Sequence, residues 1–204
     1  MARNSHLKTP RTTSALSLDE AKNHLRIPTG ITEEDDYLQA LIDTATDVAD
    51  KYCNISIMQQ TYVQYADKWE DTIQLFHSPI EGSGAVDMVQ VEYIATGDGT
   101  TYSTWAITNY KFDKYSCPTR LVHENGKDYP SIEDIINAIK IEYKVGYGTA
   151  SDVPKGIKQA LLIMVGQWYE NRQEAIVGRS VGTIPMTATY ILDKYRIRTF
   201  GIPN

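Results

Sequence analysis

The amino-acid sequence predicts an α+β fold, in which two helices, an antiparallel β insertion and two more helices follow one another along 204 residues. Three observations predict it. Apolar residues recur every three or four positions over 32–53 and 154–174, as on one face of an amphipathic helix. Between these segments, apolar and polar residues alternate at 139–145, as in a half-buried strand. Gly97-Asp98-Gly99 is typical of a hairpin turn.

The first two helices begin at capping residues. Ser17 and Glu20 have the spacing of a capping box, which predicts a short helix to about residue 27. Thr32 is expected to cap the second helix, whose first turn holds the acidic run 33–36, favourable at the positive end of a helix dipole. The periodicity of the long helices predicts a core that includes Leu38, Leu41, Ile42, Ala45, Ile157, Leu161, Val165 and Trp168.

The middle of the chain is predicted to be short strands separated by turns. The expected strands are 58–66, 73–76, 89–93, 101–107, 110–112, 119–122 and 139–145. A long helix follows from about 152 to 174, then a loop over 175–186 with two glycines and a proline, and a short helix over about 187–195.

Charge is distributed unevenly and suggests a domain plan. Residues 1–14 hold three basic and no acidic side chains, 18–53 hold nine acidic and three basic ones, and 155–204 hold seven basic and three acidic ones. The sequence therefore predicts four parts. They are a flexible basic arm (1–16), a helical domain formed by 17–53 and 152–195, a β-rich insertion (54–151) and a C-terminal docking tail (196–204).

Composition excludes several classes of protein. A net charge of −6 argues against a protein that coats nucleic acid. No apolar run is long enough to span a membrane, and residues 1–14 do not resemble a signal peptide. Cys53 and Cys117 lack CxxC spacing, as expected of reduced thiols. Fourteen tyrosines against three phenylalanines suit half-buried sheet faces and subunit interfaces.

No motif makes a positive case for an enzyme, a metal or a cofactor. The four histidines lie in different predicted elements, and the run 33–36 lacks the ligand spacing and glycine of an EF-hand. No nucleophile elbow and no glycine-rich phosphate loop is present. A hydrolase or nuclease would need two carboxylates and a metal in one cleft, whereas these carboxylates fall on successive turns of an exposed helix.

Two segments allow more than one interpretation. Residues 168–172 (WYENR) could form a ligand site, but the simpler interpretation packs Trp168 and Tyr169 in the core and ends the helix with the other three. The basic segment 194–200 could be frayed, but its apolar residues favour docking on an acidic partner.

Several strings, taken in order, resemble one family. They are LSLDEAKNHLR (16–26), DYLQALI (36–42), GDG (97–99), YKFD (110–113), GYG (146–148), VPKGIKQA (153–160) and WYENR (168–172). The ordered set resembles the tailed-phage head-tail connector (adaptor) proteins, often described as putative DNA-packaging proteins. The resemblance spans about 17–196, and residues 122–137 look longer than the corresponding link in the family.

The resemblance implies a small helical bundle with a β insertion, which acts as a structural virion protein without enzymatic activity or cofactor. It implies a ring of about twelve copies in the virion neck, assembled in the host cytoplasm. Its partners would be the portal protein on one side, a stopper or tail-completion protein on the other, and genomic DNA that passes through without sequence-specific binding. No membrane is implied.

Two sets of residues follow from combining the resemblance with the charge pattern. The set expected to dock on the portal is Tyr195, Arg196, Ile197, Arg198, Phe200 and Ile202. The acidic face expected to line the channel, where it would not hold passing DNA, is Glu33, Glu34, Asp36, Asp43, Asp47 and Asp50. The alternative is a β-rich ligand- or peptide-binding module of a bacterial or prophage protein, with Tyr102, Trp105 and Tyr110 as an aromatic platform.

Overall fold

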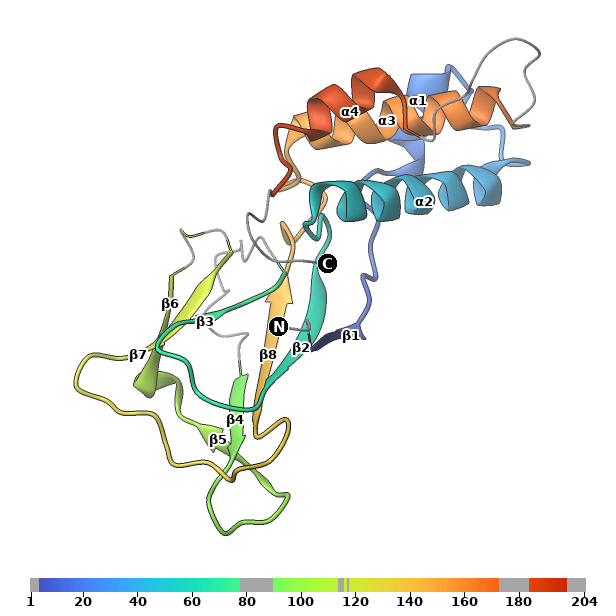
Figure 1. Cartoon of the computed structure of the whole chain (residues 1–204). Coiled ribbons are helices and arrows are strands. Elements are labelled where there is room, and N and C mark those ends of the chain that lie inside the picture. The colour runs from blue at the N-terminus through green and yellow to red at the C-terminus, as the bar shows by residue number, and fades with distance from the viewer. Residues whose placement is uncertain (1–3, 78–89, 114–115, 117, 173–183, 198–204) are drawn as a thin grey trace. The chain divides into compact units, whose positions relative to one another are not determined.

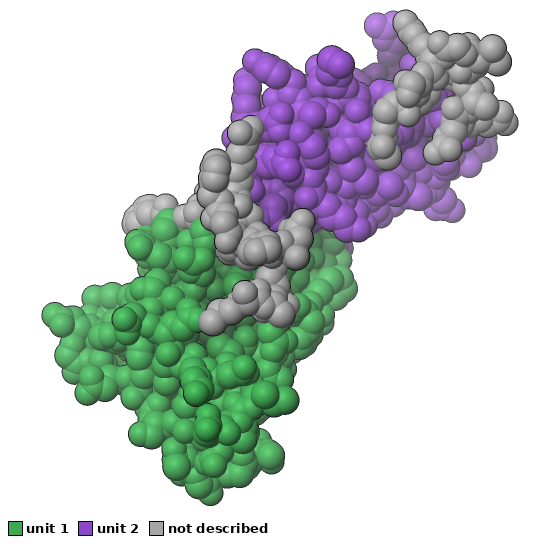
Figure 2. Space-filling view, in the orientation of Figure 1, with its two compact units in different colours: residues 1–11, 59–148, 199–204 green, residues 12–58, 149–198 purple. Residues whose placement is uncertain are grey.

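A computed structural model describes residues 4–77, 90–113, 116, 118–172 and 184–197. The chain forms two compact units (Figure 2). One, the β unit, comprises 1–11, 59–148 and 199–204, and the other, the helical unit, comprises 12–58 and 149–198. Helices and antiparallel sheets are both present, so the predicted α+β class is confirmed. No described helix is long and apolar enough to cross a bilayer.

Four helices make up the regular structure of the helical unit. They are α1 (Leu18–Leu25), α2 (Asp35–Cys53), α3 (Lys155–Glu170) and α4 (Met186–Leu192). Helix α3 packs against each of the other three (Figure 1). Of the expected core residues, Leu38, Ile42, Ala45, Ile157, Leu161 and Val165 are buried. Leu41 and Trp168 are only half-buried.

Helix α1 begins at the predicted capping box. The Ser17 hydroxyl accepts a hydrogen bond from the Glu20 amide (3.1 Å), and the Glu20 carboxylate accepts one from the Ser17 amide (2.8 Å). Two amides at the helix start are thereby satisfied by the side chains of the two residues. The capping box is confirmed.

The predicted Thr32 cap of α2 is wrong. The helix begins at Asp35, and its N-cap is Glu34, which makes no side-chain capping bond. Thr32 contributes its carbonyl instead, which accepts a hydrogen bond from the Asp35 amide (3.2 Å). The reason is a contact from another helix, because the Lys22 ammonium of α1 donates to the Ile31 carbonyl (2.7 Å) and positions this turn.

The β unit contains two antiparallel sheets. The five-stranded sheet has the order β1 (Ser5–Thr9), β2 (Gln60–Ala66), β8 (Ile139–Val145), β4 (Gln90–Ile94) and β5 (Tyr102–Trp105). The three-stranded sheet has the order β3 (Ile73–Gln74), β7 (Arg120–His123) and β6 (Tyr110–Asp113), with a 3₁₀ turn at Ile107–Asn109 before β6. The glycines Gly97 and Gly99 of the predicted hairpin have φ values of 90° and 68°, in the region that favours glycine.

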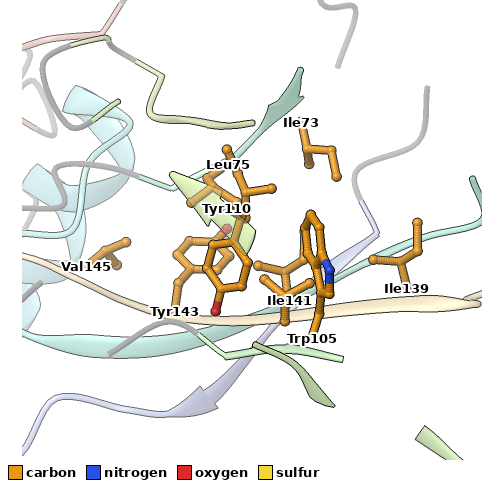
Figure 3. Packing of buried hydrophobic residues seen from close by; sticks show 10 residues of the cluster. Ile73, Leu75, Trp105, Tyr110, Ile139, Ile141, Tyr143 and Val145 are labelled. Atoms are coloured by element: carbon orange, nitrogen blue, oxygen red, sulfur yellow. The ribbon is translucent and has the colours of Figure 1, made fainter. Parts of the chain in front are cut away.

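The apolar core of the β unit is built on one face of β8 (Figure 3). Ile139, Ile141, Tyr143 and Val145 are all buried, as their alternation with charged residues predicts. Side chains from both sheets complete this cluster, which also includes Ile73, Leu75, Val91, Trp105, Tyr110 and Leu121. The charged face of the same strand carries an ion pair between Lys140 and Glu92 (2.6 Å).

Residues 5–9 of the predicted flexible arm form an edge strand. Strand β1 pairs with β2, and the Asn4 carbonyl accepts a hydrogen bond from the Tyr65 amide (2.8 Å). Lys8 forms an ion pair with Glu142 across the sheet (2.5 Å). Four of the five residues are exposed, so the segment has no apolar alternation that could predict a strand. Its pairing with β2 holds it in place.

Candidate assembly surfaces

The acidic residues of α2 differ in their exposure to solvent. Their spacings of seven, four and three residues place Asp36, Asp43, Asp47 and Asp50 along one face of the helix. Asp36 and Asp47 are exposed, as is Glu33 before the helix. Asp43 accepts hydrogen bonds from Ser14 and from Gln39, and Asp50 accepts one from the Ile57 amide (2.8 Å).

Asp43 and Asp50 therefore also hold neighbouring segments of the chain. Asp43 fixes the residues that precede α1, and Asp50 fixes the turn after α2. These two aspartates of the predicted acidic face thus have a structural role, which the sequence pattern did not indicate.

Glu34 belongs to a different group, the Arg172 cluster, formed by Glu34, Tyr37, Tyr169 and Arg172. The Arg172 guanidinium lies over the Tyr37 ring (4.6 Å) and the Tyr169 ring (5.0 Å) and forms an ion pair with Glu34 (2.5 Å). The Tyr169 hydroxyl donates a hydrogen bond to the Glu34 carboxylate. The cluster joins the start of α2 to the end of α3. The simpler interpretation of the sequence, in which Tyr169 fills the core and Arg172 ends the helix, is therefore incomplete.

These contacts shift the pKa values of two members of the cluster. The hydrogen bond from Tyr169, followed by that from Arg172, lowers the pKa of Glu34 below its ordinary value. The hydrogen bond to Glu34 raises the pKa of Tyr169. Glu34 therefore stays ionised, and the ion pair persists, throughout the neutral range.

Replacing Glu34 with glutamine is expected to lower the free energy of unfolding near neutral pH and to have a smaller effect in acid. A carboxyl whose pKa is lowered by folding stabilises the fold above its unfolded pKa of 4.5, and this contribution is lost as the pH falls through the folded pKa. Urea unfolding of both proteins at about pH 7 and about pH 3 measures the difference. With the exposed Glu33→Gln as control, a difference for Glu34→Gln that is the same at both pH values would contradict the assignment.

Lys22 is a buried cation that the sequence did not single out. Its side chain is 3% exposed and forms an ion pair with Asp35 (2.5 Å). Its ammonium also donates to the carbonyls of Ile31 (2.7 Å) and Thr29 (3.4 Å). One side chain of α1 thus holds the whole turn that leads into α2. The position of Lys22 in α1 does not indicate this role, because its partners lie seven to thirteen residues later in the sequence.

The part of the predicted docking set that the structure describes lies against its own helical unit. Building a Cβ on Gly156 of α3 would place it 2.5 Å from the Tyr195 hydroxyl, so the glycine permits this close approach. The Arg196 guanidinium lies over the Tyr52 ring (5.0 Å), and the Ile197 amide donates to the Cys53 carbonyl (2.9 Å). Arg198, Phe200 and Ile202 lie outside the described residues.

The end of α2 is tied to α4 by two further contacts. The Tyr52 hydroxyl donates to Asp193 (2.7 Å), and the Cys53 thiol lies 3.5 Å from the Leu192 carbonyl. Burial, followed by the charge of Asp50, raises the pKa of Cys53 to about 12. The thiol is therefore protonated and packed, as expected from its position on an amphipathic helix. Cys117 lies outside the described residues.

The aromatic platform of the alternative hypothesis is wrong. Trp105 and Tyr110 are each 5% exposed and belong to the core of the β unit (Figure 3). The Tyr102 hydroxyl donates to the Asn137 carbonyl (2.7 Å). Trp69 and Tyr129, which come from two loops remote from β5 in sequence, cover Trp105.

Large apolar side chains that reach solvent mark further candidate surfaces. Met186 is 89% exposed and Tyr190 is 69% exposed, both on α4, and Ile136 of the β unit is 79% exposed. Such side chains on a folded surface are candidates for protein contacts. Among the described residues, no group of three or more His, Cys, Asp or Glu side chains is placed to hold a metal ion.

The N-terminal part of the chain matches a known protein family. Residues 15–96, which include α1, α2 and strands β2 to β4, match the family model described as phage gp6-like head-tail connector protein. The predicted resemblance to the phage head-tail connectors is confirmed. No curated protein matches the chain significantly.

The likeness to solved structures covers nearly the whole chain. A chain from "Neck of empty GTA particle computed with C6 symmetry" is 18% identical with a TM-score of 0.73, and the match covers 97% of each chain. A chain from "Virion of native gene transfer agent (GTA) particle" gives the same values. A third, from "Neck of native GTA particle computed with C12 symmetry", is 16% identical with a TM-score of 0.66 and covers 96% of this chain and 98% of the other. At these identities the likeness shows a shared fold.

Proposed function

We propose that this chain is a head-tail connector, a structural protein of the virion neck that joins the capsid portal to the tail. The observation that carries this proposal is the agreement of two comparisons. The family model covers the first helices and strands, and the fold likeness to chains of neck and virion particles covers 97% of the chain. A structural role without catalysis agrees with this family.

Within the neck, the chain is proposed to form a ring of about twelve copies around the DNA. The six-fold and twelve-fold symmetries of the similar neck structures support a ring. Genomic DNA would pass through it without sequence-specific binding. The exposed acids Glu33, Asp36 and Asp47 would form the acidic part of the channel wall, because a negative surface does not hold phosphates.

The two rims of the ring are proposed to meet different proteins, the portal on one side and a stopper or tail-completion protein on the other. The contacts of Tyr195, Arg196 and Ile197 with the helical unit sharpen the docking proposal. In this form, the portal meets a segment whose first residues are already packed on α2 and α3, together with Arg198, Phe200 and Ile202. The helical unit would therefore present the docking residues at a defined position.

Deleting the gene for this chain is expected to yield DNA-filled heads and free tails that do not join. Electron microscopy of particles produced with and without the chain measures this directly. Supplying the purified protein should restore tailed particles, whereas Gly156→Leu, which would displace Tyr195, should restore fewer. Normal tailed particles in the absence of the chain would overturn the proposal.

A further inference from the structure

Residues 124–127 form an exposed turn directly after β7. The Glu124 carbonyl accepts a hydrogen bond from the Lys127 amide (3.0 Å), and Gly126 has a φ of 76°, as at the third position of a type II turn. Asn125, Gly126 and Lys127 are exposed. A Cβ built on Gly126 would have no heavy atom within 4 Å apart from those of its neighbours in the chain. Water therefore reaches the peptide bond between Asn125 and Gly126.

Two amide groups of this turn are free to react. Within the part of the chain that the structure describes, neither the side-chain amide of Asn125 nor the main-chain amide of Gly126 takes part in a hydrogen bond. One backbone hydrogen bond, donated by Lys127, closes the turn. Because glycine has no Cβ, the peptide before it rotates easily, and its nitrogen can be approached closely.

We propose that Asn125 is a site of spontaneous covalent modification, at which the side-chain amide is lost through a cyclic imide with Gly126. The Gly126 nitrogen attacks Cγ of Asn125, so that a new C–N bond forms while the bond from Cγ to the side-chain nitrogen breaks. The proton of the Gly126 amide goes to the leaving nitrogen, which departs as ammonia.

Water completes the reaction by opening the imide at either of its two carbonyl groups. Breaking the new bond to Cγ gives aspartate at position 125. Breaking the bond to the main-chain carbonyl carbon gives isoaspartate, in which the chain runs through Cγ. Water is the only reactant besides the chain itself, so no enzyme, oxidant or cofactor is needed.

Other asparagines lack this combination of features. Asn125 is the only asparagine that precedes a glycine in the sequence. After Asn54, the Ile55 amide already donates to a carbonyl of α2 (3.1 Å). The amide of Asn137 donates to the Asp67 carboxylate (2.7 Å), which opposes rotation of its backbone. The imide should therefore form first at Asn125.

The product changes the surface of the β unit but not its core. A new carboxylate would lie beside Glu124, which already forms an ion pair with Lys111 (2.6 Å). Isoaspartate also adds a carbon atom to the main chain, which displaces the Lys127 amide from its acceptor. The stacked rings of Tyr129 and Trp69 (4.7 Å) lie outside the turn. The modified chain should remain folded with one additional negative charge, and this inference is independent of the connector proposal.

Incubating the purified full chain for several days at neutral pH and physiological temperature tests the proposal. Trypsin cuts the chain so that three asparagines fall in separate peptides, which are 52–68 (Asn54), 121–127 (Asn125) and 128–140 (Asn137). We expect mass spectrometry to show the conversion of amide to acid several-fold faster in 121–127 than in the other two, with more isoaspartate than aspartate. Protein digested without incubation gives the background from the digestion.

The folded chain is expected to react within about ten-fold of the rate of a synthetic 121–127 peptide, because an exposed turn opens at little cost in free energy. Gly126→Ala should slow the reaction several-fold. Alanine is strained at this φ and would loosen the turn, which by itself would speed the reaction, so slowing would come from the added Cβ. Asn125→Gln keeps the glycine and should prevent the acidic form, seen by ion-exchange chromatography, because its ring would have six members.

Four results would overturn the inference. The first is conversion of Asn125 no faster than that of Asn54 and Asn137. The second is aspartate without isoaspartate, which would indicate direct hydrolysis instead of an imide. The third is an unchanged rate in Gly126→Ala, and the fourth is a folded chain that reacts more than about ten-fold slower than the peptide, which would show that the turn protects the site.

Discussion

Replacing Trp105 with alanine is expected to destabilise the β unit by about 3–5 kcal/mol, the usual cost of removing a large buried aromatic side chain. Trp105 is 5% exposed, and its ring lies 5.2 Å from Trp69, 5.2 Å from Tyr110 and 5.4 Å from Tyr129, measured between ring centres. The three neighbouring rings are packed around Trp105, so alanine at this position would leave a cavity that they could fill only by moving.

Hydrogen exchange of the β8 amides, measured in the full chain, reports the stability of the β unit separately from that of the helical unit. The matched control is Tyr190→Ala, which also removes an aromatic ring but from an exposed position. A loss below about 1 kcal/mol for Trp105→Ala would contradict the core assignment and restore the aromatic platform as a candidate binding surface.

Replacing Lys22 with methionine is expected to destabilise the helical unit by about 2–4 kcal/mol, because it leaves buried partners without a donor. The methionine keeps most of the apolar length of the side chain. It cannot donate to the carbonyls of Thr29 and Ile31 or neutralise Asp35, all of which the ammonium contacts. The turn before α2 should therefore open.

Urea unfolding followed by circular dichroism gives the stability change, and Lys51→Met is the control because Lys51 is exposed on α2. Hydrogen exchange at the start of α2 should rise in Lys22→Met and stay unchanged in Lys51→Met. Equal effects of the two substitutions would show that Lys22 does not organise this turn.

Elements defined by local patterns were predictable from the sequence. The amphipathic period of α2 and α3, the alternation in β8 and the capping box of α1 each depend on residues close together in the chain. The hairpin with Gly97 and Gly99 is local in the same sense. These features were sufficient for the fold class and for the resemblance to connectors.

Features that depend on distant partners were not predictable. Strand β1 exists because β2 pairs with it, and the start of α2 is set by Lys22 of another helix. The Arg172 cluster joins residues about 135 positions apart, through contacts that no spacing in the sequence indicates. The same reason explains why Trp105 was placed on a surface, since the loops that cover it are remote in sequence.

The acidic face of α2 shows how local and distant information combine. Helical spacing correctly places Asp36, Asp43, Asp47 and Asp50 along one direction of the helix. Only the tertiary structure separates the two that hold neighbouring segments, Asp43 and Asp50, from the exposed pair. Proposals about a channel wall therefore rest on the exposed residues.

Copies of this chain are proposed to form a ring between capsid and tail. A reconstruction of the neck of the intact particle, with this chain fitted to the density, decides whether they do. We expect a closed ring of this chain below the portal, with the acids of α2 toward the DNA. Density for this chain outside the neck, or its absence from the particle, would show that the ring proposal is wrong.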